Sequence, residues 1–257
     1  MSAPPAETSA ESTADGTDDG IAAAIGARCA AGGVDLYATC AAEDYDAAVP
    51  PAYHLPDLGR RRALVVVLGN TRALWPHVRA AAAAGARHPV DEHVTTVVRG
   101  AVDAALASRS PRPRAEIRFA PEPPPRRVAM QRLAHVAGLA WLAPSHVCVH
   151  PIYGPWIALR AAVVIDVEGP PPRPPLPPPC DCAAGCQPAL ERALAAGAPR
   201  DQAELRERWK LWLAVRDGCP VGRDHRYSDD QIRYHYAGDR SGQADPTAKP
   251  PAALPER

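Results

Sequence analysis

Two segments of the chain have the hydrophobic pattern of strands that are buried on both faces. Residues 63–68 (ALVVVL) form a continuous apolar run, which is typical of an interior strand. Residues 156–165 alternate, and the alternation predicts one side for Ile157, Leu159, Ala161, Val163 and Ile165 and the other for Trp156, Ala158, Arg160, Ala162 and Val164. Because both sides are largely apolar, this segment also predicts an interior strand.

Arg160 is the exception in that strand. A guanidinium among buried neighbours costs free energy unless an anion or several acceptors meet it. Two interpretations stay open at this stage. One is an internal ion pair with an Asp or Glu of the chain, and the other is a pocket for a carboxylate or phosphate of a ligand.

Helical periodicity, capping residues and Pro/Gly breaks place the remaining elements. Helices are predicted over residues 21–31, 72–84, 91–107, 127–142, 189–196 and 202–215, with a short one after Ser228. Further strands are predicted over residues 34–40, 115–119 and 147–150. The turn residues at 151–155 predict that strands 147–150 and 156–165 form a hairpin. Strands and helices mixed without strict βαβ order indicate an α+β fold.

Proline content divides the chain into segments. Residues 169–179 (GPPPRPPLPPP) are nearly all proline and must be extended. We therefore predict an α+β core over 21–168, a Pro-rich strap over 169–180 and a C-terminal helical cap over 181–240. The tails, 1–20 and 241–257, are predicted to be disordered because they cannot bury enough apolar surface.

Composition excludes some classes of function. The chain has 29 basic and 29 acidic residues, so no overall field attracts nucleic acid or an anionic membrane. No apolar run approaches the ~20 residues of a membrane span, and the acidic start does not predict a secretory signal. Seven cysteines, an odd number, argue against a disulfide framework and favour a cytoplasmic location.

One group of cysteines has a spacing that could bind a metal. Cys180, Cys182 and Cys186 form C-x-C-x(3)-C, one ligand short of an iron–sulfur motif. Zinc could take a fourth ligand from Cys219 or His225. Free thiols in a reducing compartment are the alternative. No resident metal ligand is assigned at this stage.

Five blocks of the chain resemble one protein family. They are VPPAYHLP (49–56), HPVDEHV (88–94), PRRVAMQRLAHVAG (125–138), VCVHPIYGPWIALR (147–160) and RYSDDQIRYHY (226–236). They resemble, in order and spacing, the CblC (MMACHC) family of cyanocobalamin reductases and alkylcobalamin dealkylases. The resemblance implies a nitroreductase-like flavin fold with a mixed sheet flanked by helices.

The resemblance also implies a function and a set of site residues. The implied function is intracellular cobalamin processing, by reductive removal of cyanide and by glutathione-dependent dealkylation, with FMN or FAD as electron source. Glutathione binding is implied for Arg160, Arg216 and Arg240. Cobalamin binding is implied for Val128, Ala129, Met130, Gln131, His135, Leu142, Ala143, Cys148 and Leu159. His135 is expected to support the pocket, and the loop at 121–127 resembles an element of family dimer contacts.

Several functional questions stay open on the sequence alone. No nucleophile elbow, Walker A or GxGxxG motif is present, so no catalytic side chain is assigned and the chemistry is expected to belong to a bound cofactor. His150 at a strand end is expected to stabilise a turn, and Cys148 is expected to be buried and inert. The alternatives are a flavin-dependent reductase without a corrinoid and a non-catalytic corrinoid or metal carrier.

Overall fold

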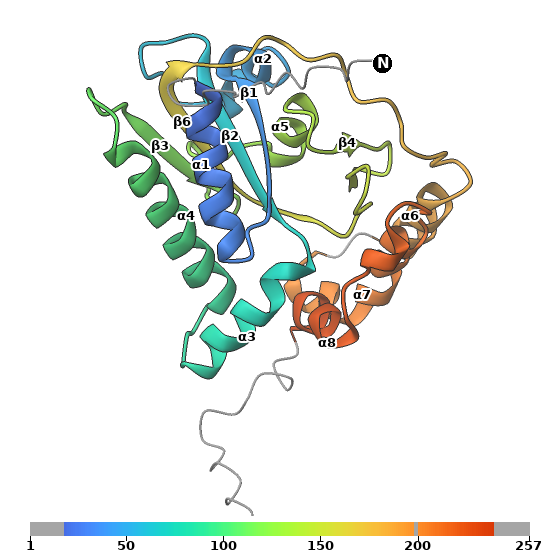
Figure 1. Cartoon of the computed structure of the whole chain (residues 1–257). Helices are drawn as coiled ribbons and strands as arrows, with labels where there is room; N and C mark the ends of the chain where they lie inside the picture. The colour runs from blue at the N-terminus through green and yellow to red at the C-terminus, as the bar shows by residue number, and fades with distance from the viewer. Residues whose placement is uncertain (1–17, 198–199, 239–257) are drawn as a thin grey trace, which may run out of the picture.

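The computed structural model describes residues 18–197 and 200–238. Its centre is a four-stranded sheet in the order β1 (Leu36–Ala41), β2 (Ala63–Asn70), β6 (Ala158–Glu168), β3 (Ala115–Phe119) (Figure 1). All three pairings are antiparallel, so the prediction of a mixed sheet is wrong in this detail. The two strands predicted to be interior, β2 and β6, are the central pair.

Helices cover both faces of the sheet (Figure 1). On one face, α1 (Asp18–Ala31), α3 (Trp75–Ala83) and α4 (Pro89–Ala107) pack on one side of β2 and β6 in a single apolar cluster. On the other face, α2 (Ala42–Asp46) and α5 (Met130–Val136) pack on the opposite side of the same strands. Burial on both faces explains why β2 is apolar from Ala63 to Leu68.

Short helices and caps complete the N-terminal half. A 3-10 turn, η1 (Pro51–Tyr53), follows α2, and a second, η2 (Arg72–Leu74), leads into α3. The hydroxyl oxygen of Thr71 accepts a hydrogen bond from the Ala73 backbone N–H at 3.1 Å and so caps the start of this helix.

The segment before β6 differs from the prediction. The predicted helix over 127–142 is only α5, because Gly138 adopts a left-handed φ of 73° and Leu139 N–H turns back to Ala134 O at 2.8 Å, as at many helix ends. The chain then forms β4 (Trp141–Leu142), which pairs with β5 (Cys148–Val149). The predicted hairpin between 147–150 and 156–165 is therefore wrong, since β5 pairs with β4.

The C-terminal cap is helical, as predicted. It consists of α6 (Cys186–Ala195), α7 (Gln202–Asp217), the 3-10 turn η3 (Arg223–His225), α8 (Asp229–Ile232) and a π-helical turn, η4 (Arg233–Ala237). The cap meets the core where two glycines touch: Gly154 (φ 57°) and Gly222 (φ 69°) lie back to back, with no room for a Cβ on either.

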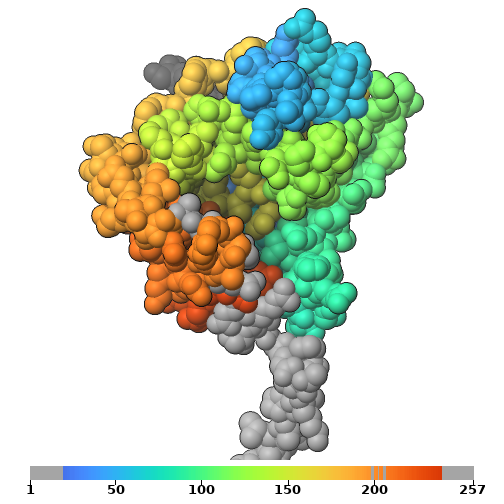
Figure 2. All heavy atoms as spheres, turned by 180° about the vertical axis from the view of Figure 1, so that it is seen from behind, coloured from blue at the N-terminus to red at the C-terminus, as the bar shows by residue number. Residues whose placement is uncertain are grey.

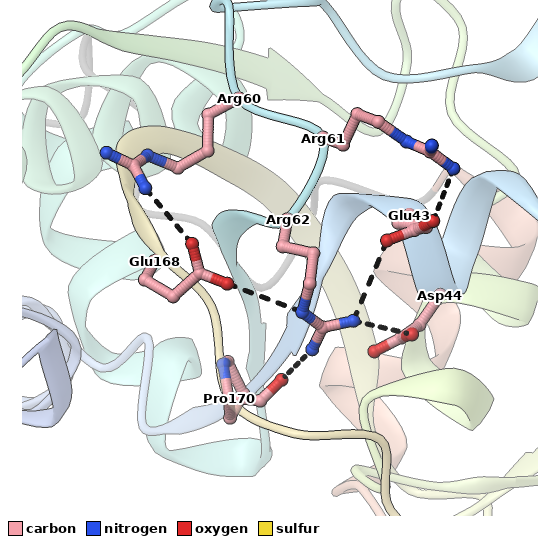
Figure 3. Close-up of polar contacts among 7 residues, drawn as sticks. All are labelled: Glu43, Asp44, Arg60, Arg61, Arg62, Glu168 and Pro170. Carbon is pink, nitrogen blue, oxygen red and sulfur yellow. Dashed lines mark hydrogen bonds and ion pairs between the residues drawn. The ribbon is translucent and has the colours of Figure 1, made fainter.

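Residues 169–179 cross from the sheet to the cap without helix or strand. Arg62 fixes the start of this strap (Figure 3): its guanidinium donates to Pro170 O at 2.6 Å and lies 3.4 Å from Glu168 and 3.3 Å from Asp44. The Gly169 N–H also donates to Arg62 O at 2.6 Å. None of the helices in the described residues is long and apolar enough to cross a bilayer.

Candidate functional site

A cavity of about 500 Å³ lies between the sheet core and the C-terminal cap. Figure 2 shows this face hollowed between the yellow-green segment that contains α5 and β5 and the orange helices of the cap. The volume is within the range of small-molecule sites. The lining comprises Met130, Gln131, Ser145, His146, Val147, Cys148, Ile157, Ala158, Leu159, Leu190, Trp212, Val215, Arg216 and Tyr236.

A β-bulge at Arg160 shapes one wall of the cavity. Leu68 pairs with Ala161 but Gly69 pairs with Leu159, so one extra residue stands on β6. The bulge breaks the predicted alternation. Ile157 and Leu159 lie against the α5 side with Ala162 and Val164, and the prediction that they share a side with Ala161 is wrong. The broken alternation turns Leu159 into the cavity.

The opposite wall comes from α5 and β5. The Gln131 amide donates to His146 O at 2.6 Å, and the Cys148 thiol donates to Gln131 O at 3.7 Å. Burial raises the pKa of Cys148 to about 12, so this thiol is protonated at neutral pH and is no nucleophile. It presents a small polarizable surface to the cavity.

Arg216 of α7 brings a positive charge to the cavity. Its guanidinium carbon lies 5.8, 5.9 and 6.0 Å from the ring centroids of Trp156, Tyr227 and Tyr236, and one nitrogen donates to Ile157 O at 3.3 Å. Within residues 18–197 and 200–238, no carboxylate forms an ion pair with it. Because Arg216 contacts rings and donates to only one carbonyl, most of its five N–H donors can bind a ligand.

Arg160 stands at the bulge, close enough to Arg216 for their charges to interact. Its Nε donates to Asn70 Oδ1 at 2.5 Å. Burial lowers the pKa of Arg160 and Arg216 adds to this effect, whereas Tyr227 and the more distant carboxylate of Asp91 oppose it. No Asp or Glu of the described chain pairs with Arg160, so the interpretation of an internal ion pair is wrong and the ligand-pocket interpretation stays a prediction.

Two ring side chains, Tyr227 and His235, lie close enough to the two arginines to interact with their charges. The Tyr227 hydroxyl is buried, has no hydrogen-bond partner in the structure, and lies in a residue only 3% exposed. Burial, together with the charges of Arg160 and Arg216, lowers the pKa of His235 to about 4. An excess of positive charge and an unsatisfied hydroxyl are what an anion would relieve.

The predicted cobalamin residues divide into two groups. Met130, Gln131, Cys148 and Leu159 line the cavity. The others do not: Val128 and Ala143 are buried in the apolar clusters, Ala129 N–H donates to the Tyr45 hydroxyl, Leu142 packs against the α5 cluster, and His135 Nδ1 accepts from Leu142 N–H.

His135 instead lines a second cavity of about 300 Å³ beneath the strap, together with Cys40, Asp44 and Arg173. Arg240 lies outside the described residues. His150 accepts the backbone N–H groups of Ile152 and Tyr153 at 3.1 and 3.3 Å, the turn-stabilising role expected of it.

Sequence reasoning assigned Arg216 but missed the rest of the cap side of the cavity and the 145–147 turn. Trp212 lies in no motif, Tyr236 ends the block at 226–236 without an assigned role, and only the docking of the cap brings them to the cavity. His146 did carry a structural signal, since it is the one non-glycine residue of the described chain with a left-handed φ, at 60°. Strained backbone of this kind often lies at ligand sites, but no local pattern reveals it.

Comparison with known proteins gives the family. No protein-family model matches the chain. The human cyanocobalamin reductase/alkylcobalamin dealkylase is 30% identical over 241 residues, which cover 82% of this chain and 78% of the human protein. The mouse protein of the same name is 30% identical over 154 residues, which cover 51% of this chain and 53%, about half, of that relative.

Solved structures give the fold. A Caenorhabditis elegans B12-trafficking protein CblC, a human MMACHC homologue, superposes with a TM-score of 0.58 at 16% identity, over 84% of this chain and 90% of that one. An epoxyqueuosine reductase superposes with a TM-score of 0.52 at 14% identity, over 79% and 66%. The predicted nitroreductase-like α+β fold is thus confirmed. Because the chain is 30% identical to the human protein over 78% of that protein's length, it belongs to the cyanocobalamin reductase/alkylcobalamin dealkylase family.

Proposed function

We propose that this protein binds cobalamin in the cavity between core and cap and removes the axial group from cobalt. One observation supports this most directly: an apolar wall that includes Met130 and Leu159 faces a guanidinium, Arg216, that has no carboxylate partner among the described residues. The apolar wall suits the face of a corrin ring, and the free guanidinium suits an anionic co-substrate. The names of the human and mouse relatives support the reaction class.

For alkylcobalamins, we propose glutathione as the co-substrate. Its thiolate attacks the alkyl carbon, the carbon–sulfur bond forms, and the carbon–cobalt bond breaks with its electron pair left on cob(I)alamin. Glutathione carries two carboxylates, and planar guanidinium groups bind carboxylates through paired hydrogen bonds. Arg160 and Arg216 would bind them, and Arg240 stays a prediction from the resemblance. No protein side chain has to transfer a proton, so the contribution of the chain is orientation and exclusion of water.

For cyanocobalamin, we propose reduction of cobalt with release of cyanide. A bound reduced flavin, FMN or FAD, would supply the electrons. The cavity residues fit such a group, because Met130 and Leu159 offer an apolar surface for a flat ring and Arg216 offers a cation for a phosphate. The role of these residues would be to hold donor and corrinoid in the same dry site.

The surroundings of the reaction are also proposals. All seven cysteines are unpaired in the structure, which supports a reducing compartment such as the cytoplasm. A homodimer through the loop at 121–127 rests on the family resemblance alone.

Turnover of two substrates tests the proposal. Purified protein with methylcobalamin and glutathione should yield S-methylglutathione and a reduced cobalamin, and glutathione without protein should yield neither at a comparable rate. Cyanocobalamin with reduced flavin should release cyanide. Oxidation of NAD(P)H through bound flavin without any cobalamin binding would instead identify a corrinoid-independent reductase. Tight cobalamin binding without turnover of either substrate would identify a carrier.

A further inference from the structure

Four thiols lie close together at the edge of the cap, next to the cavity but not among the residues that line it. We call Cys180, Cys182, Cys186 and Cys219 the thiol cluster. Cys182, Cys186 and Cys219 are buried in one apolar group, and the half-buried Cys180 packs against it. The first three come from the C-x-C-x(3)-C segment, and the fourth follows α7. The structure thus brings together cysteines that are more than thirty positions apart.

Two glycines make this meeting possible. A Cβ on Gly185 would lie 2.7 Å from Gly218 O, and a Cβ on Gly218 would lie 3.1 Å from Gly185 O. The loop before α6 and the end of α7 therefore touch backbone to backbone, which only glycine allows. The structure also separates the two candidates for a fourth ligand. His225 packs against the ring of Tyr153, with centroids 4.8 Å apart, whereas Cys219 joins the cluster.

One pair of thiols in the cluster has the sulfur–sulfur distance of two thiolates on one small cation, a distance that an S–H···S hydrogen bond also has. The Sγ atoms of Cys180 and Cys182 are 3.8 Å apart. In a tetrahedral site with Zn–S bonds of about 2.3 Å, two sulfurs are separated by 2.3 multiplied by 1.63, or about 3.8 Å. A disulfide needs about 2.0 Å. The sulfurs that hold a four-iron cluster lie farther apart, because the iron atoms stand between them.

The chemistry of the cluster also suits a cation. The backbone N–H of Val221 donates to the sulfur of Cys219. Four adjacent thiolates would repel one another without a cation between them, but a bound divalent metal supplies that positive charge and deprotonates its thiol ligands. A backbone N–H on a ligand sulfur is the kind of supporting contact that metal sites use.

We propose that the thiol cluster is a zinc site with four cysteine ligands. Zinc binding releases four protons and leaves four thiolate–zinc bonds, without any change of oxidation state. No three His, Cys, Asp or Glu side chains of the described residues close around one point in this structure, and the Cys186 Sγ lies 3.1 Å from Ser145 Oγ. To complete the site, Cys186 must therefore turn away from Ser145 and the other three sulfurs must draw closer together. The metal would tie the end of the strap to α6 and to α7, the helix that supplies Trp212 and Arg216 to the cavity.

Metal analysis of the full chain tests this inference. Protein purified without chelator should contain close to one zinc per chain and negligible iron. Removal of zinc and addition of Co²⁺ should produce the intense visible bands of tetrahedral cobalt and the near-ultraviolet charge-transfer band of thiolate ligands. Both signals should disappear in Cys219→Ser and in Cys180→Ser. Cys180 is the less buried of the two, so this second variant keeps the test valid if Cys219→Ser does not fold.

Cys29→Ser is the matched control, because Cys29 is equally buried but lies in the α1 cluster on the other side of the sheet. It should retain zinc and the cobalt spectrum. Three results would each overturn the inference: metal-free folded protein that gives no cobalt bands, stoichiometric iron with absorbance near 400 nm, or full zinc content in Cys180→Ser and Cys219→Ser. These readouts do not involve cobalamin, so they are independent of the proposed function.

Discussion

Replacement of Arg160 by methionine separates a ligand-binding arginine from a structural one. Arg160 has no carboxylate partner among the described residues and one hydrogen bond, to Asn70 Oδ1. Methionine keeps most of the length of the side chain and removes the charge. If the guanidinium binds a carboxylate of glutathione, the loss of a charge-assisted hydrogen bond costs about 1.5–3 kcal/mol. That is about a 10- to 150-fold weaker use of glutathione.

The stability of Arg160→Met should change little. The folded state no longer carries a desolvated charge, but Asn70 Oδ1 loses its donor, which costs about 1–3 kcal/mol. Because the two effects oppose each other, we expect the unfolding free energy to change by no more than about 1 kcal/mol. A structural arginine would show a larger loss and no selectivity for the thiol-dependent step.

The assay follows methylcobalamin absorbance at increasing glutathione and, separately, cobalamin binding without thiol. Arg160→Met should raise the glutathione concentration needed for half-maximal rate and leave the cobalamin affinity within about twofold. Arg112→Met is the control, because Arg112 is exposed, pairs with Asp103 at 2.7 Å, and lies away from the cavity. Equal loss of cobalamin binding and of thiol-dependent turnover would refute the assignment of Arg160 to the co-substrate.

Three further substitutions test the strap, the docking of the cap and the charge around the cavity. Arg62→Ala should make residues 169–179 more sensitive to limited proteolysis. The control Arg61→Ala should not, because the Arg61 side chain is 86% exposed, and equal cleavage of the two variants would contradict the anchoring role of Arg62. Gly154→Ala should lower the Tm several degrees more than Gly85→Ala, because both have a positive φ but only Gly154 faces another backbone; equal shifts would contradict the close contact. The pKa of His235 is about 4 in the folded protein and 6.5 in a free histidine. Between these two pH values the unfolded chain therefore binds more protons than the folded one, and the free energy of unfolding should fall as the pH falls from 6.5 to 4. His235→Asn should flatten that slope in urea titrations by up to about 3 kcal/mol over the window, and an unchanged slope would contradict the shift.

The sequence was sufficient to place most elements and five of the fourteen residues that line the cavity. The apolar runs of β2 and β6 and the stripe of α4 depend on local periodicity, and these elements were predicted close to their observed bounds. The register of β6 was not predictable, because the bulge at Arg160 arises from the pairing of Leu159 with Gly69, ninety positions away. The bulge alone decides that Leu159 faces the cavity.

Interactions between distant segments account for the other errors. The helix predicted over 127–142 stops early because Gly138 adopts a left-handed φ. A glycine permits this conformation, but its presence in the sequence does not show that the conformation is adopted. The pairing of β5 with β4 depends on that stop. Trp212 and Tyr236 reach the cavity only because the cap docks through Gly154. Tertiary contact, rather than local preference, decided each case.

The measurement that most directly tests the central claim is an absorbance titration of the protein with methylcobalamin. The account predicts a saturable shift to the spectrum of cobalamin whose nucleotide base has left cobalt. It also predicts loss of that shift in Ala158→Trp, which fills the cavity from β6 and leaves both arginines in the sequence. No shift at saturating cobalamin, or an undiminished shift in Ala158→Trp, would contradict the claim that this cavity holds the corrin ring.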